Sequence, residues 1–464
     1  MSAKTWTGVD GQCAFTVFTR IEGGKSGADA VVAILTPIGD HVATNDDVPF
    51  AQLAGLHFAS FCAVPLSSGD WYLVFEGNVD GTPADFLREL VGRAGPKLRE
   101  IYGHCLDFPV GDAATDEAVL TYLLAHDIGA DTFYVGWAGW SVERIRREKA
   151  LRDAIEALVE SPGFTVPPDA DLATFHAAIR DGIAGDPQLR WTSEPPTRPA
   201  VVRYGRLALV GILAALVLVV LRLVRRAAGP VRSAARRRAG RSLRILVGLL
   251  VATAVRLRTA ESDDERRDRQ RSPGWQAAYD EWSRHLGKVR VREDEQVQNH
   301  MISVIPIKPG WFRLAVLRTV LWVINLAARL WWNRGELGGI GSIHFARWVI
   351  PPDGRDLIFL SNYDGSWESY LDEFIDRASV GLSAVWSNTD NEVGFPATRW
   401  LVSGGARDEA RFKAFARRSM WPTTVWYSAY PSLSVANIRT NMAIRDDLPT
   451  SLDPVSDDVW LGRL

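Results

Sequence analysis

The sequence predicts an α+β protein whose two halves repeat one folding unit, with an apolar and arginine-rich segment between them. Two observations carry this prediction. Short motifs recur in the same order on both sides of the central segment, and each half mixes strand-forming with helix-forming stretches. The chain has 464 residues, of which 47% are hydrophobic and 23% charged, so it has enough apolar material for two packed domains.

The clearest repeated motif is His-Phe-Ala, which occurs at residues 57–59 and again at 344–346. A second motif shares an asparagine, an aspartate and a glycine in each half: Asn78, Asp80 and Gly81 match Asn362, Asp364 and Gly365. The matches stay in order while their separation drifts by a few residues, as loop insertions would produce. The chain is therefore predicted to contain an internal duplication.

The first half, residues 1–160, is predicted to contain four strands. They are the stretches rich in β-branched and aromatic residues, at 14–21, 56–64, 71–78 and 131–139. A helix is expected over 82–94, because Thr82 suits the N-cap, Pro83 the first helical position and Asp85 the third residue after the cap.

The second half, residues 296–448, repeats this scheme. Its expected strands are 301–307, 344–350, 356–362 and 423–430, and its matching helix covers 366–378. The order strand, helix, strand, strand, helix, strand is that of a ferredoxin-like unit. One such antiparallel sheet leaves an apolar face bare, so we expect the duplicated units to close an α+β barrel within one chain.

The connecting segments differ in composition. Residues 161–203 are rich in proline and predict a linker with at most one short helix, around 171–183. Residues 258–295 are dense in both signs of charge and predict a solvated connector, and 449–464 form a C-terminal tail.

Residues 204–257 are predicted to be a membrane-associated helical segment. The apolar run from Leu207 to Leu221 is shorter than the about 20 residues that cross a bilayer upright, although Arg206 and Arg222 could snorkel and lengthen it. The run from Ile245 to Val255 is shorter still. Between the runs, the chain carries many arginines that suit anionic lipid head groups: Arg222, Arg225, Arg226, Arg232, Arg236, Arg237, Arg238, Arg241 and Arg244.

These arginines restrict the topology. If both runs crossed the membrane, the positive-inside rule would place both halves outside, which requires export of the first half without a signal sequence. If only the first run crossed, the halves would lie on opposite sides and could not share a barrel. We therefore expect both halves at the cytoplasmic face, with the segment in the inner leaflet. A tryptophan-containing helix over 310–332 suits either the membrane interface or the cover of its own sheet.

Composition also excludes some functions. The formal net charge of −2 argues against a nucleic-acid partner. The three cysteines, Cys13, Cys62 and Cys105, are scattered without a CxxC pair, which argues against a structural zinc site or a disulfide framework and favours a reducing compartment. No P-loop, HExxH motif or Ser-His-Asp order is present.

Residues 77–81, Gly-Asn-Val-Asp-Gly, fit the pattern GxxDG. In this pattern and in its two-unit architecture the chain resembles the dye-decolourising peroxidases, which are haem enzymes built from two ferredoxin-like units. The resemblance implies that Asp80 is the distal acid that moves a proton between peroxide oxygens, and that a histidine holds the haem iron. The second half has Ser361 in place of Gly77, and the axial ligand is marked only by position: His285, His300 or His344.

The chain also resembles an uncharacterised group of bacterial membrane-associated proteins, through the segments IHFARW, SNYDGSWESY and WYSAYP. That resemblance implies no function.

The repeated aspartates and histidines have simpler explanations as well. Asp80 and Asp364 suit a turn that leaves a strand and leads into a helix cap. His57 and His344 could bond to a neighbouring backbone, or could meet across a pseudo-twofold axis and hold a metal or a proton.

The second half is unusually aromatic, which suits either a core of large rings or a pocket for a flat or lipid-like ligand: Trp386, Trp400, Trp421, Trp426, Tyr427 and Tyr430. Two functions follow from the sequence. The first is a membrane-associated binding or scaffold protein at the cytoplasmic face, with anionic lipids as partners. The alternative is a haem-dependent, peroxidase-like oxidoreductase that uses Asp80.

Overall fold

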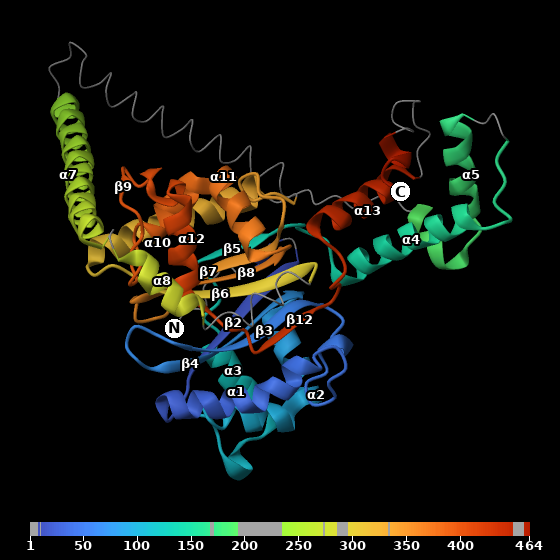
Figure 1. Cartoon of the computed structure of the whole chain (residues 1–464), viewed down its shortest axis with the longest axis horizontal. Coiled ribbons are helices and arrows are strands. Elements are labelled where there is room, and N and C mark those ends of the chain that lie inside the picture. Colours follow the sequence, from blue (N-terminus) through green and yellow to red (C-terminus); the bar gives the residue numbers. More distant parts are fainter. Residues whose placement is uncertain are drawn as a thin grey trace.

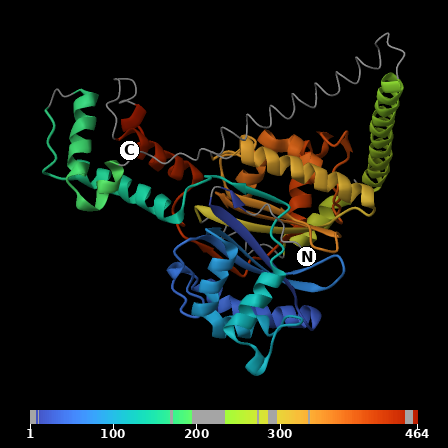
Figure 2. The same cartoon turned by 180° about the vertical axis from the view of Figure 1, so that it is seen from behind.

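Two five-stranded antiparallel sheets face each other at the centre of the protein, and helices cover the outer face of each (Figures 1 and 2). The computed structural model describes residues 8–9, 11–167, 171–193, 234–271, 274–284, 296–332, 335–448 and 459–464. One long helix projects from one side of this body, and a group of helices near the C-terminus projects from the other (Figure 1).

The first sheet has the strand order β1-β2-β4-β3-β12. These strands are β1 (Gly8–Val9), β2 (Gln12–Arg20), β4 (Trp71–Asp80), β3 (Leu56–Pro65) and β12 (Val425–Ser428). The helices α1 (Gly24–Asp40), α2 (Pro83–Tyr102) and α3 (Asp116–His126) pack against it. The Thr82 hydroxyl accepts the Asp85 amide at 3.2 Å and caps α2, as predicted.

The second sheet has the order β11-β6-β8-β7-β5. These strands are β11 (Met420–Trp421), β6 (Gln298–Pro306), β8 (Asp356–Asp364), β7 (Ile343–Val349) and β5 (Thr132–Val135). The helices α10 (Trp311–Leu330), α11 (Trp367–Trp386) and α12 (Glu409–Ser419) pack on its outer face. Helix α11 bends at Ala378, which leaves the helical conformation with φ −128° and ψ 19°.

Each half contributes its last strand to the sheet of the other half. In β5, Phe133 pairs with Arg347 of β7, and in β12, Tyr427 pairs with Ala59 of β3. The sequence predicted that the four strands of each half would form a sheet of their own. That prediction is wrong, because one strand of each half lies in the sheet of the other half. Main-chain hydrogen bonds from the exchanged strand cover the outer edges of β3 and β7, which would otherwise remain open, and the exchange ties the sheets together.

Alternation along the strands sorts the apolar side chains into two layers. In β6, Ile302 and Val304 face the core between the sheets, whereas Met301 and Ile305 pack under the helices of the second sheet. This two-layer arrangement places polar side chains of the inner faces between the sheets, where they must find partners within the protein.

A third apolar cluster holds the projecting helices together. It joins α4 (Val142–Glu160), α5 (Leu172–Ala184) and α13 (Val435–Asp447). Helix α5 is the one predicted within the linker. Trp460 of the predicted C-terminal tail is buried in this cluster, and its Nε1 donates to the Ile444 carbonyl at 3.0 Å.

The prediction that residues 258–295 are a solvated connector is wrong for residues 258–271, which belong to the long helix α7 (Ala234–Arg271). Glu261 is buried and accepts the Leu401 amide at 2.7 Å, and Asp264 lies 3.0 Å from Lys308 Nζ. Buried charges persist where they are paired, so this charged face docks onto the body instead of facing water.

Candidate functional site

The repeated His-Phe-Ala motifs meet between the two sheets. The rings of His57 and Phe345 have centroids 5.2 Å apart, and those of Phe58 and His344 are 5.3 Å apart. Phe58 and Phe345 also pack edge to face at 5.7 Å. Both histidines are buried, and the two halves contact each other here in a nearly symmetric way.

Each histidine bonds the aspartate of the second repeated motif. His57 Nε2 lies 3.0 Å from Asp80 Oδ1, and His344 Nε2 lies 2.7 Å from Asp364 Oδ1. The other oxygen of Asp80 accepts the Val142 amide at 2.9 Å, and that of Asp364 accepts the Val435 amide at 2.7 Å. These amides open α4 and α13, where a negative charge is favourable. The paired aspartates thus direct the two projecting helices.

Two glutamines complete the arrangement, and the sequence analysis missed them. Gln12 pairs with Asp80 across the sheet and donates to the Trp140 carbonyl at 2.7 Å. Gln298 pairs with Asp364 and donates to the Tyr430 carbonyl at 3.1 Å. Their signal is the spacing of 45 and 46 residues ahead of the histidine of each motif.

Tyr430 joins the two histidine sets. Its hydroxyl lies 2.9 Å from His57 Nδ1, and its ring packs against Phe58. Burial, followed by the nearby carboxylates of Asp80 and Asp364, raises the pKa of Tyr430, so the phenol stays protonated. A histidine that donates from Nε2 to Asp80 can accept the phenol proton at Nδ1.

Polar partners occupy both ring nitrogens of His300 and Nε2 of His344, the two described candidates for the iron ligand that the peroxidase resemblance implies. Nε2 of His344 bonds Asp364, and His300 has Nδ1 at 2.8 Å from Thr423 Oγ1 and Nε2 at 3.4 Å from Glu76 Oε1. An axial ligand needs a ring nitrogen that is open to the metal. His285 lies outside the described residues, among which no group of three or more His, Cys, Asp or Glu could hold a metal ion.

A buried ion pair links the two sheets. Arg347 Nη2 of β7 lies 2.6 Å from Glu76 Oε2 of β4, and it donates to the Gly77 carbonyl at 3.0 Å. Glu76 also accepts the Ser60 hydroxyl at 3.1 Å. Burial opposes ionisation of Glu76, but Arg347, His300 and Ser60 outweigh it and lower the pKa of this carboxyl.

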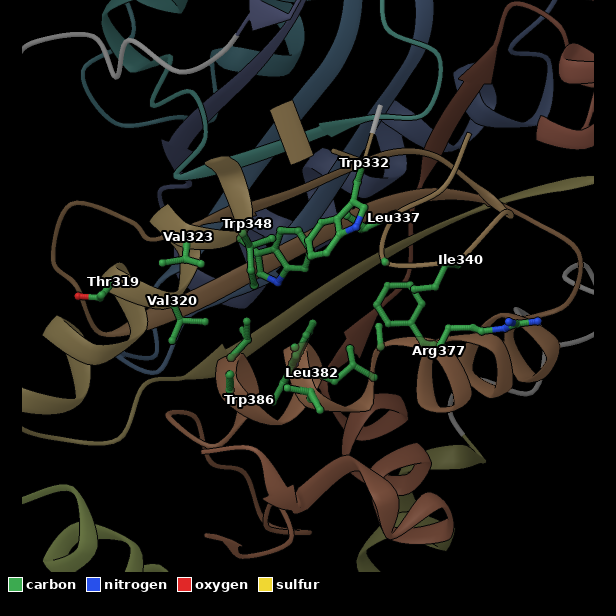
Figure 3. Close-up of a pocket in the computed structure, with 18 residues that line it drawn as sticks. Thr319, Val320, Val323, Trp332, Leu337, Ile340, Trp348, Arg377, Leu382 and Trp386 are labelled. Carbon is green, nitrogen blue, oxygen red and sulfur yellow. The ribbon is translucent and has the colours of Figure 1, made fainter. Parts of the chain in front are cut away.

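An apolar cavity of about 460 Å³ lies on the outer side of the second sheet, between α10 and α11 (Figure 3). Trp332, Trp348 and Trp386 contribute aromatic walls, and the bend of α11 at Ala378 lies in its lining. Arg377 is the charged residue of the lining, and its side chain extends away from the other labelled residues (Figure 3). The size and the apolar walls are those of a small-molecule pocket.

The other predicted aromatic residues lie apart from this cavity. Trp421, Trp426 and Tyr427 line a second cavity of about 470 Å³ beside His300. Trp400 is exposed on the surface.

Helix α7 shows an apolar surface before it reaches the body. Its exposed large side chains, from 40% to 63% accessible, are Ile245, Leu246, Val247, Leu249, Leu250, Val251 and Val255. The next residue, Arg256, places its guanidinium 4.4 Å from the ring centroid of Trp311, an exposed residue at the start of α10. The end of the apolar surface of α7 thus meets the start of α10.

Helix α10 is, among the described residues, the one helix long and apolar enough to cross a membrane, and 28% of its most apolar stretch is buried. Trp322 and Val323 are exposed on it. The predicted membrane-contacting residues of the central segment lie outside the described residues: Arg206, Leu207, Leu221, Arg222, Arg225 and Arg226.

Comparison of the chain with family models, curated proteins and solved structures gives no match. The family resemblances rest on the sequence motifs alone.

Proposed function

We propose that this protein is a membrane-associated binding protein whose α+β body lies at the bilayer surface and holds an apolar, lipid-like ligand. The observation that carries this proposal is the exposed apolar surface of α7 between Ile245 and Val255. Contiguous apolar surface of this kind marks contact with a membrane or a partner. Arginines at both ends and tryptophans on the neighbouring α10 are the residues that a membrane interface favours.

The length of this stretch favours insertion into one leaflet. As a helix, residues 245–255 are about 16 Å long, against about 30 Å for the hydrocarbon core of a bilayer. The cytoplasmic leaflet is the expected side because its anionic lipids attract the arginines between the two apolar runs.

We further infer that the body is a duplicated ferredoxin-like unit closed into a barrel. The corresponding strand orders β2-β4-β3-β12 and β6-β8-β7-β5 support this inference, as do the matching sets of glutamine, histidine and aspartate. In such a barrel, each sheet buries the apolar face of the other.

The cavity between α10 and α11 is the proposed ligand site. Val323 both lines this cavity and is exposed on α10, so the cavity lies beside the surface that would face the membrane. Apolar walls favour an aliphatic chain or a flat ring, because the ligand leaves water when it binds.

Vesicle flotation tests the membrane contact. Leu250→Glu should lower partitioning of the full chain into anionic vesicles about tenfold or more, because an acidic side chain costs about 2.5 kcal/mol or more at membrane depth. The matched control is Val110→Glu, which changes another exposed apolar residue, 71% accessible, on the first half. Equal flotation of Leu250→Glu and the control would contradict the proposal.

A second pair of variants tests the cavity. Gly381 lines it, and a Cβ added there meets nothing within 4 Å, so Gly381→Leu should place its side chain in part of the cavity. Gly92 of α2 has the same open surroundings away from the cavity, and Gly92→Leu is the control. Binding of cis-parinaric acid, a fluorescent fatty acid, should weaken at least about tenfold in Gly381→Leu only. Unchanged binding would remove this cavity as the ligand site.

A further inference from the structure

A pocket of about 370 Å³ lies where α7 meets the start of α10. Four cationic side chains line it: Arg256 and Arg267 of α7, Lys308 after β6, and Arg313 of α10. Two carboxylates, Asp263 and Asp264, line it as well. Asp263 pairs with Arg266, a residue that does not line the pocket.

The remaining carboxylate is shared. Asp264 Oδ2 lies 3.0 Å from Lys308 Nζ and also pairs with Arg313, while Asp264 Oδ1 lies 3.9 Å from Arg267. One buried carboxylate therefore serves three cations. Burial, together with repulsion from Arg313, outweighs the attraction of Asp264 and lowers the pKa of Lys308. The pocket has an excess of positive charge that an anion would offset.

Arg313 supplies the second observation. It is only 5% exposed, and its Nη2 donates to the Ala260 carbonyl at 2.9 Å. Within the part of the chain that the structure describes, its Nη1 has no hydrogen-bond partner. A buried donor without an acceptor is costly, and it leaves part of the Arg313 charge uncompensated in the wall of the pocket.

The position of the pocket indicates which anion it would meet. Arg256 lines it and directly follows the apolar stretch of α7. If that stretch enters a leaflet, the pocket lies at the level of the head groups. Arginine forks match the oxygens of a phosphate group in geometry and charge.

We infer that this pocket binds a phosphate group, through Arg256, Arg267, Lys308 and Arg313. The source expected for it is the head group of an anionic phospholipid. That source rests on the proposed membrane function, whereas the phosphate site itself does not.

The test uses the full chain in mild detergent and two probes. Calorimetric titration with inorganic phosphate at constant ionic strength measures the site directly. Flotation with zwitterionic and with anionic phospholipid vesicles measures the lipid source. Arg267→Gln and Arg313→Gln should each weaken binding about fivefold or more, since each removes one basic residue near the anion. The control is Arg88→Gln, an exposed arginine on α2.

The two probes separate the outcomes. Weaker binding of both phosphate and anionic vesicles supports a lipid phosphate. Weaker binding of anionic vesicles alone overturns the phosphate site, because loss of a positive charge weakens contact with any anionic surface. Weaker binding of phosphate alone supports the site and overturns the lipid source. Phosphate binding by a chain that floats with no vesicles keeps the site while the membrane proposal fails. If both variants match Arg88→Gln with both probes, the inference is wrong. Because Arg313 is buried, Arg267→Gln, whose side chain is 48% exposed, decides if Arg313→Gln does not fold.

Discussion

Removal of Arg347 from its ion pair with Glu76 should be among the most destabilising single changes in the two-sheet body. Both side chains are buried, and they come from opposite sheets. Arg347→Met leaves the Glu76 carboxylate buried with only His300 and Ser60 beside it. Removing one partner of a buried pair costs about 3–5 kcal/mol. The carbonyls of Phe15 and Gly77 also lose their guanidinium donor, which moves the expected loss toward the upper end.

Denaturant unfolding, followed in parallel by tryptophan fluorescence and circular dichroism, measures this loss. Arg88→Met is the matched control, because Arg88 pairs with Asp85 on the exposed face of α2 and should change stability by less than about 1 kcal/mol. The double variant of Arg347→Met with Glu76→Leu should be more stable than Arg347→Met alone, because it leaves no buried charge without a partner.

Either of two results would refute this reasoning. One is a loss below about 1 kcal/mol for Arg347→Met, which would mean that water or another cation reaches Glu76. The other is a double variant no more stable than the single one, which would mean that the loss comes from packing rather than from charge.

Two further predictions concern carboxylates. The pKa of Glu76 in the folded protein lies below its ordinary value of 4.5. Its ionised carboxylate therefore stabilises the fold above that value, and this stabilisation is lost as pH falls through the folded pKa. The free energy of unfolding should accordingly fall less steeply at acid pH in Glu76→Gln than in the unchanged protein. Asp364→Asn removes the negative charge beside the first amide of α13 and should lower the free energy of unfolding by about 1 kcal/mol. Amide hydrogen exchange of residues 435–447 should become faster. Unchanged protection of these amides would contradict the role assigned to Asp364.

Local sequence patterns predicted many of the strands and helices. Alternating and β-branched residues placed the main strands, and Thr82 marked the start of α2. The choice of partner strand could not be predicted, because the alternation within β5 or β12 is the same whichever sheet receives it. The sequence likewise marked His57 and Asp80 as repeated residues but could not pair them, since their contact depends on that register. The sequence of charges in residues 258–271 would be the same if they faced water or if they paired with cations of another segment. The sequence alone therefore could not show that this helix docks onto the body.

The exchange of β5 and β12 also sets an order of events during synthesis. The edge of β3 is made early, but its partner β12 is made only after the whole central segment and most of the second half. Until then, β3 presents an open edge that other chains could pair with. Once both strands are in place, a cut in the central segment would leave two fragments that stay joined by two strands and an inner core. Neither half is expected to persist as a separate folded product.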